Sequence, residues 1–201
     1  MIITHYGASC FKVQSGETVL VFDPPSKDSS YKSPRFQANI VLISFNNKDH
    51  NGSDNISSKV EGEETPFIIN GPGEYEVSGV AVTGYADEQN TIYLLQCENI
   101  SVCHLGSLSE VELDSDAQEG VSGADILLVP IRNDEDAEKM AKLINQTDAK
   151  IVIPMHYNDV TLKKFLKEEG GEGVIHTDKL TIKKKDLEKE KTEIVVLKPV
   201  I

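Results

Sequence analysis

Seven residues, Ser-Phe-Asn-Asn-Lys-Asp-His at positions 44–50, follow directly on a short apolar run. They look like a metal-binding turn at the end of a strand. Asp49 and His50 offer a carboxylate oxygen and an imidazole nitrogen, and His104 and His156 each follow a later apolar run. Imidazole nitrogens and carboxylate oxygens are ligands that zinc and non-haem iron(II) take in proteins. These residues indicate hydrolytic metal chemistry if the fold brings them together.

Each of these side chains also has an ordinary structural interpretation. Asp49 can cap a turn or the start of a helix. His104 ends an apolar strand, so it can be a core histidine satisfied by a backbone carbonyl. His156 can serve only to orient a loop. The remaining histidines, His5 and His176, match no ligand position and are interpreted as strand residues.

Five segments resemble landmarks of one protein family and occur in the right order. They lie at 6–11, 21–24, 71–77, 104–107 and 153–157, and they read Tyr-Gly-Ala-Ser-Cys-Phe, Val-Phe-Asp-Pro, Gly-Pro-Gly-Glu-Tyr-Glu-Val, His-Leu-Gly-Ser and Ile-Pro-Met-His-Tyr. Together they span nearly the whole chain. The chain therefore resembles the metallo-β-lactamase superfamily, and within it the ascorbate-6-phosphate-lactonase-like branch.

The resemblance implies a dinuclear metal centre with several ligands replaced. The family carries His-x-His-x-Asp-His at the end of such a strand, and its first two histidines fall on Phe45 and Asn47. The aspartate that bridges the two metals falls on Ser107. An alcohol is a poor ligand until it is ionised, and an amide oxygen is a weak zinc ligand beside an imidazole. The first metal position would thus keep His104 alone.

The second metal position keeps its three side-chain ligands, Asp49, His50 and His156. The resemblance therefore allows one metal ion, Zn or else Fe or Mn, and it equally allows none. Asp23 matches a family aspartate near the metal centre, where it or His104 would assist proton transfer. A turn residue before a proline is the other interpretation of Asp23.

Composition narrows the classes of function. A net charge of −13 repels phosphates and anionic membranes, so neither nucleic acid nor a membrane is an expected partner. No run approaches the ~18 apolar residues of a membrane span, and the N-terminus does not read as a signal peptide. The odd number of cysteines, three, suits a reducing cytoplasm. With 201 residues we expect one domain, 1–201, in which an oligomer interface is possible but not indicated.

Local patterns predict mostly strands in the first half and alternating strands and helices after about residue 105. Asn133 or Asp134, and Asn158 or Asp159, are expected to cap two helices. Strands are expected at 2–6, 18–22, 40–44, 67–70, 79–84, 91–96, 100–104, 126–131, 150–155, 174–176, 180–183 and 194–197, with a tight hairpin at 96–99. These patterns favour an α+β fold, and the resemblance implies the four-layer αββα sandwich of the metallo-β-lactamases.

The residues leave two functions open. The first is a non-catalytic relative, a pseudoenzyme candidate that keeps the fold in order to bind a small molecule or a partner protein. The second is a hydrolase of an ester, lactone or phosphoester that uses a mononuclear centre at Asp49, His50 and His156. The loss of the bridging carboxylate at Ser107 favours the first.

Overall fold

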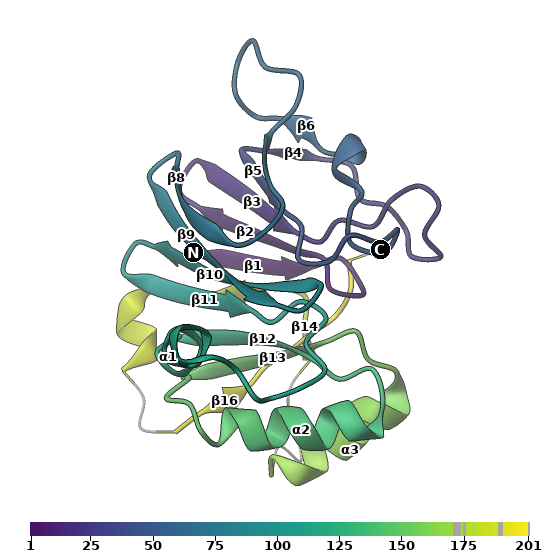
Figure 1. Ribbon diagram of the computed structural model, residues 1–201, viewed down its shortest axis with the longest axis vertical. Helices are drawn as coiled ribbons and strands as arrows, with labels where there is room; N and C mark the ends of the chain where they lie inside the picture. The colour runs from purple at the N-terminus through teal and green to yellow at the C-terminus, as the bar shows by residue number, and fades with distance from the viewer. Residues whose placement is uncertain (171–173, 175, 189–190, 201) are drawn as a thin grey trace.

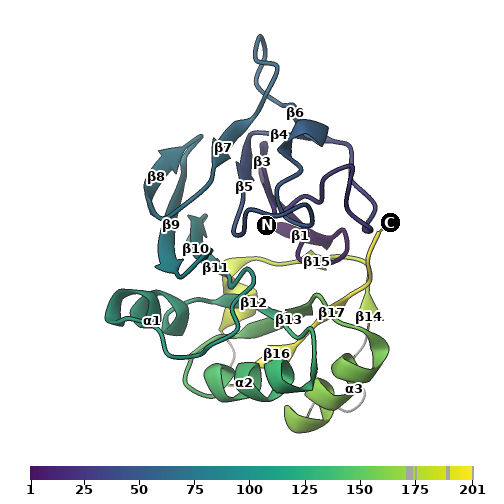
Figure 2. The same cartoon turned by 45° about the vertical axis from the view of Figure 1, so that its right-hand side comes forward.

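The computed structural model describes residues 1–170, 174, 176–188 and 191–200. Two large β-sheets face each other in this part of the chain, and three α-helices lie outside one of them (Figure 1). The turned view shows β1, β3 and β5 above β12 and β13, with α2 and α3 below (Figure 2). The expected α+β class is confirmed.

The first sheet has six strands in the order β15-β1-β2-β3-β5-β7. Its strands β1, β2 and β3 are antiparallel neighbours, whereas β5 and β7 run parallel to β3. The strand bounds are β1 (Ile2–His5), β2 (Phe11–Ser15), β3 (Thr18–Phe22), β5 (Ile40–Leu42), β7 (Phe67–Ile69) and β15 (Leu180–Thr181).

The second sheet has seven strands in the order β16-β13-β12-β11-β10-β9-β8. Strands β11, β12, β13 and β16 are parallel, and β8 to β11 are antiparallel. The bounds are β8 (Gly73–Val77), β9 (Val80–Asp87), β10 (Asn90–Cys97), β11 (Ile100–His104), β12 (Ile126–Pro130), β13 (Ile151–Met155) and β16 (Glu193–Ile194). Two short pairs complete the strands: β4 (Gln37–Ala38) with β6 (Ser57–Ser58), and β14 (His176–Thr177) with β17 (Val196–Leu197).

A buried apolar layer joins the two large sheets. Alternate residues of β3, such as Leu20 and Phe22, face residues of the second sheet such as Leu128 and Ile153, and all four are fully buried. Each side chain of this size stabilises the fold by roughly 1.5–3 kcal/mol relative to exposure. This layer fixes how the strand ends of one sheet meet those of the other.

The three α-helices supply a second apolar layer on the outer face of the seven-stranded sheet. They are α1 (Ser115–Ser122), α2 (Asp134–Ile144) and α3 (Asp159–Glu168). Asp114, Asn133 and Asn158 cap them through side-chain oxygens that accept backbone N–H groups. Their apolar faces pack against the other side of β10 to β13. No helix in the described residues is long and apolar enough to cross a membrane.

In the described part of the chain, the outer face of the six-stranded sheet is covered by an irregular segment and not by α-helices. Val19, Val21 and Val41 pack there with Ile56 and Phe36, which belong to the long segment between β3 and β7. This segment contains β4, β6 and the 3-10 helix η1 (Ser53–Asn55), but no α-helix. One outer layer of the sandwich is therefore irregular, because the polar sequence there lacks an apolar helical period.

Most elements agree with the sequence expectations. The strands at 18–22 and 100–104 have the expected bounds, and both helices begin after the expected asparagine caps. The hairpin at 96–99 is confirmed, since Glu98 and Asn99 both have the positive φ of a type I′ turn. Strands β2 and β8 and helix α1 were not expected, and residue 175 of the strand expected at 174–176 lies outside the described residues.

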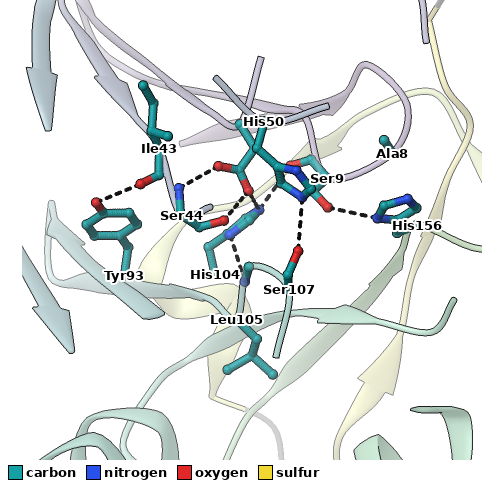
Figure 3. A network of polar contacts seen from close by, with 12 residues as sticks. Ala8, Ser9, Ile43, Ser44, His50, Tyr93, His104, Leu105, Ser107 and His156 are labelled. Carbon is teal, nitrogen blue, oxygen red and sulfur yellow. Dashed lines mark hydrogen bonds and ion pairs between the residues drawn. The ribbon is translucent and has the colours of Figure 1, made fainter. Parts of the chain in front are cut away.

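One buried hydroxyl ties the two sheets together at the edge where β5 and β7 end. Tyr93 of β10 donates to the carbonyl oxygen of Ile43 at 3.0 Å (Figure 3). Its oxygen also accepts the backbone N–H of Gly71 at 2.9 Å. Burial raises the pKa of Tyr93 to about 12, so the phenol keeps its proton.

We predict that Tyr93→Phe lowers the free energy of unfolding by about 1–3 kcal/mol, because the buried carbonyl of Ile43 and the partly buried N–H of Gly71 lose their partner. Chemical denaturation measures the difference. Tyr6→Phe is the control, since the Tyr6 hydroxyl makes no hydrogen bond within the described residues; it should change stability by less than about 0.5 kcal/mol. Equal effects of the two substitutions would contradict the role of Tyr93.

Candidate functional site

The ends of β5, β11 and β13 meet at one edge of the sandwich. The turn after β5 carries residues 44–50, the turn after β11 carries Ser107, and His156 follows β13 directly. Backbone hydrogen bonds join these turns to their neighbours: Thr91 N–H to Ser44 O at 2.8 Å, and His156 N–H to Ala8 O at 3.0 Å. Segments distant in sequence are thus held against each other.

A pocket of about 440 Å³ opens at this edge. It brings together Asp49, His50 and His156, and also Phe45, Asn47 and Ser107, the positions where the resemblance implies replaced ligands. Its lining is Phe45, Asn47, Asp49, His50, Asp87, Glu88, Gln89, Asn90, Ser107, Ser109, Arg132 and His156. His104 and Asp23 are not part of this lining.

His50 lies at the buried wall of the pocket, with 2% of its surface exposed. Its Nδ1 lies 2.8 Å from Asn47 Oδ1, and its Nε2 lies 3.1 Å from Ser107 Oγ (Figure 3). Burial, with the nearby His156, lowers the pKa of His50 to about 4, which keeps the imidazole neutral at pH 7. Both ring nitrogens are therefore engaged by side chains.

Asp49 and His156 line the pocket together with His50. The Asp49 carboxylate accepts a 2.6 Å hydrogen bond from the Ser29 hydroxyl. His156 has a positive φ of 55°, its Nδ1 lies 3.4 Å from Ser9 Oγ, and burial lowers its pKa. The centres of the His50 and His156 rings are 6.0 Å apart.

His104 lies behind the pocket and is fully buried. Its ring stacks on Phe22 with centroids 4.8 Å apart. Nδ1 accepts the Gly106 N–H at 3.1 Å, so Nε2 carries the proton and donates to Ser9 O at 3.0 Å. Burial lowers the pKa of His104 to about 3. The structural interpretation, a core histidine satisfied by the backbone, fits this geometry better than a metal ligand does.

Asp23 is the other predicted site residue that lies outside the pocket. It is fully buried at a φ of 44°, and its carboxyl oxygens accept hydrogen bonds from both the N–H and the hydroxyl of Ser44. Its Oδ2 is 3.8 Å from Nε2 of His104. Burial raises the pKa of Asp23 to about 7, although the Ser44 hydrogen bonds oppose the shift. Asp23 thus supports the turn that begins at Ser44.

The described side chains do not fit the family's metal centre. Within residues 1–170, 174, 176–188 and 191–200, no three His, Cys, Asp or Glu side chains are grouped so that they could hold a metal ion. The Phe45 ring meets the His50 ring edge-on at 5.9 Å, which places an apolar group beside the imidazole. Ser107 and Asn47 engage the two nitrogens of His50 instead.

Six residues of the lining were not predicted from the sequence: Asp87, Glu88, Gln89, Asn90, Ser109 and Arg132. Arg132 lies between β12 and α2; its Nε donates to Asp136 at 2.8 Å and its Nη2 donates to Leu108 O at 3.1 Å. Asn90 accepts the Ser107 N–H at 2.8 Å. Arg132 follows β12 and Asn90 is the first residue of β10, and this position at a strand end is the signal that could have identified them, since polar residues there often line sites.

A family model described as a β-lactamase superfamily domain matches residues 2–156. The chain belongs to the β-lactamase superfamily. Its fold is that of the metallo-β-lactamases, and solved structures of similar proteins have the same fold. A candidate Zn-dependent hydrolase of this superfamily from Thermotoga maritima is 28% identical, with a TM-score of 0.74 over 98% of each chain.

More distant members of the superfamily share the fold alone. Igni18, a metallo-hydrolase from Ignicoccus hospitalis, is 16% identical, with a TM-score of 0.62 over 98% of this chain and 95% of its own. YhfI, a metallo-β-lactamase-fold protein from Bacillus subtilis, is 11% identical, with a TM-score of 0.64 over 98% and 96% of the two chains. No curated protein matches the sequence.

We predict that Asp23→Asn changes how stability depends on pH. Between the ordinary pKa of 3.8 and the folded value of about 7, the folded wild type keeps a proton that the unfolded chain has released. The contribution of Asp23 to stability is therefore present below about pH 4 and is lost as the pH rises to 7. Asparagine keeps an acceptor for the Ser44 N–H and tolerates a positive φ.

The free energy of unfolding of the variant, minus that of the wild type, should thus increase from pH 4 to pH 7, by up to about 1.4 kcal/mol per pH unit. Urea titrations at several pH values measure it. Comparing variant with wild type cancels the contributions of the buried histidines. A difference that stays constant over this range would contradict the buried, protonated state of Asp23.

Proposed function

We propose that this β-lactamase superfamily protein has a degraded dinuclear site, and that it keeps the pocket to bind a small polar molecule without the family's metal chemistry. We place it in the ascorbate-6-phosphate-lactonase-like branch. The observation that carries the proposal is the contact between Ser107 and His50: where the family has a bridging carboxylate, a hydroxyl lies 3.1 Å from the nitrogen that would bind the metal.

The pocket itself supports a binding role. Its volume of about 440 Å³ lies within the ~300–1,000 Å³ of typical small-molecule sites. Arg132 supplies a positive charge, the carboxylates of Asp49, Asp87 and Glu88 supply negative charge, and Asn47, Ser107 and His156 supply neutral polar groups. A few convergent polar groups of this kind are what fixes the orientation of a small ligand.

A single-metal hydrolase is the second candidate, because Asp49, His50 and His156 line the same pocket. The low pKa values of His50 and His156 mean that protons do not compete for these imidazoles at neutral pH. Metal affinity at neutral pH would therefore be limited by the number and arrangement of ligands. That arrangement engages His50 with Asn47 and Ser107, which favours the first candidate.

The proposal also covers the domain organisation, the cellular compartment and the partners of the protein. We propose that residues 1–201 act as one domain in the cytoplasm, where the three cysteines stay reduced. The net charge of −13 argues against nucleic acid and anionic membranes as partners. The ligand is a small molecule, and self-association is compatible with the proposal.

Metal analysis tests the two candidates against each other. We predict that the chain purified without chelators holds zinc, iron and manganese at well below one ion per chain. Asp49→Asn combined with His156→Ala should not lower that content, because these groups hold no metal in the wild type. A near-stoichiometric metal that disappears in the double variant would establish the single-metal hydrolase instead.

A restored variant is the matched control. Phe45→His, Asn47→His and Ser107→Asp together return the three replaced side chains to the family pattern. We predict that this triple variant binds zinc more tightly than the wild type by isothermal titration, since it regains imidazole and carboxylate ligands. If its affinity stays at the wild-type level, the assignment of these three positions to the metal centre is wrong.

A further inference from the structure

Three side chains in the pocket form a hydrogen-bonded chain that ends on a hydroxyl. Ser107 Oγ lies 3.1 Å from His50 Nε2, and His50 Nδ1 lies 2.8 Å from Asn47 Oδ1 (Figure 3 shows the Ser107–His50 contact). Nucleophile, base and orienting group follow one another in this way in serine hydrolases, and in cysteine proteases that use Cys, His and Asn.

The positions of the protons follow from one backbone group. Asn47 Oδ1 also lies 2.8 Å from the backbone N–H of Asp49, which can only donate, so the amide oxygen must be the atom on this side. Since that oxygen can only accept, His50 carries its proton on Nδ1. Nε2 is then an acceptor, and the Ser107 hydroxyl donates to it. This is the tautomer that a general base requires.

The turn after β11 holds Ser107 in place. Gly106 has a φ of 61°, and a side chain at this position would collide with Asn90 and Ser44. Asn90 accepts the Ser107 N–H at 2.8 Å and donates to Leu105 O at 3.1 Å. The strand therefore ends in a tight turn that is fixed on both sides. Ser107 is half-buried and lines the pocket, while His50 behind it is 2% exposed.

We propose that Ser107 is a metal-independent nucleophile that attacks carboxylic esters or lactones, with His50 as general base and Asn47 as its positioning residue. This activity goes beyond the proposed function, because it gives the pocket a chemistry of its own. Arg132 lines the same pocket, and its Nη2 donates to the carbonyl of Leu108, the residue after the nucleophile. Its Nε is paired with Asp136, so the remaining guanidinium N–H groups would donate to the oxyanion.

The reaction balances without a metal or a redox partner. Ser107 Oγ forms a bond to the ester carbonyl carbon while its proton passes to His50 Nε2. The carbon–oxygen bond to the alcohol then breaks, and the alcohol leaves with that proton. Water next attacks the acyl group and gives a proton to His50, the acid leaves, and the proton returns to Ser107.

A fluorophosphonate probe tests the nucleophile directly. Attack by Ser107 Oγ forms an oxygen–phosphorus bond, expels fluoride and leaves a stable mass increase on the peptide that contains residue 107. We predict that the folded wild type is labelled with EDTA present and that Ser107→Ala is not. In His50→Gln the labelling rate should fall by about 100-fold or more. Asn47→Ala should also lower the rate, and Asn47→Asp should recover it, because a carboxylate again accepts from Nδ1.

Ser101→Ala is the matched control: Ser101 is also half-buried and hydrogen-bonded, at 3.1 Å to Asp125, but it lies outside this pocket. It should be labelled like the wild type. Thermal melts confirm that each variant is folded. Absence of label on Ser107 in the folded wild type overturns the nucleophile and leaves the metal test untouched. Label that does not depend on His50 also overturns it, and label lost in EDTA and restored by zinc overturns the proposed function as well.

Discussion

The burial of polar groups where the two sheets meet is the constraint on which the site depends. The apolar layer between the sheets brings the ends of β5, β11 and β13 to one edge, and there the backbone and side-chain polar groups leave water. Each of them then needs a partner, because an unpaired buried group costs about 1–3 kcal/mol. The Asp23 carboxyl group accepts the Ser44 N–H, and the Ser9 carbonyl accepts the ring N–H of His104. The Tyr93 hydroxyl donates to the Ile43 carbonyl. The pocket residues lie next to these hydrogen-bonded polar groups, which fix their positions.

The sequence predicted the scaffold well because strands and helices leave periodic signals. β3 and β11 had the expected bounds, and the asparagine caps of α2 and α3 were evident from residue type. β2 was not predicted because Phe11–Ser15 is short and directly follows a turn rich in small residues. Its three buried side chains give only a weak periodic signal. α1 was missed because only its Asp114 cap and a few buried residues mark it in a largely acidic and polar stretch. The irregular layer over the six-stranded sheet left no periodic signal at all.

The site was predicted only in part, for a reason that strand geometry explains. Asp49, His50 and His156 lie in turns after strands, so their side chains are free to face the pocket. His104 is the last residue within β11, where the sheet fixes its direction, and it points into the layer between the sheets against Phe22. The sequence Cys-His-Leu-Gly-Ser does not by itself tell which of its side chains reaches the pocket. Ser107 does, because Gly106 turns the chain, and Arg132 joins it from a loop that carried no motif.

The proposed replacements at Asn47 and Ser107 belong together, since these two side chains meet the two nitrogens of the same His50 ring. A zinc-binding histidine typically donates one ring N–H to an acceptor and offers the other nitrogen to the metal. His50 keeps that arrangement: Asn47 accepts from Nδ1, and Nε2 stays unprotonated. The ring is thus held in the tautomer that a metal would need, with a hydroxyl at the nitrogen where the cation would lie. Under the proposed function, a proton donor at Nε2 takes the place of the family's cation, which keeps the ring partnered on both sides and changes the chemistry that the pocket can perform.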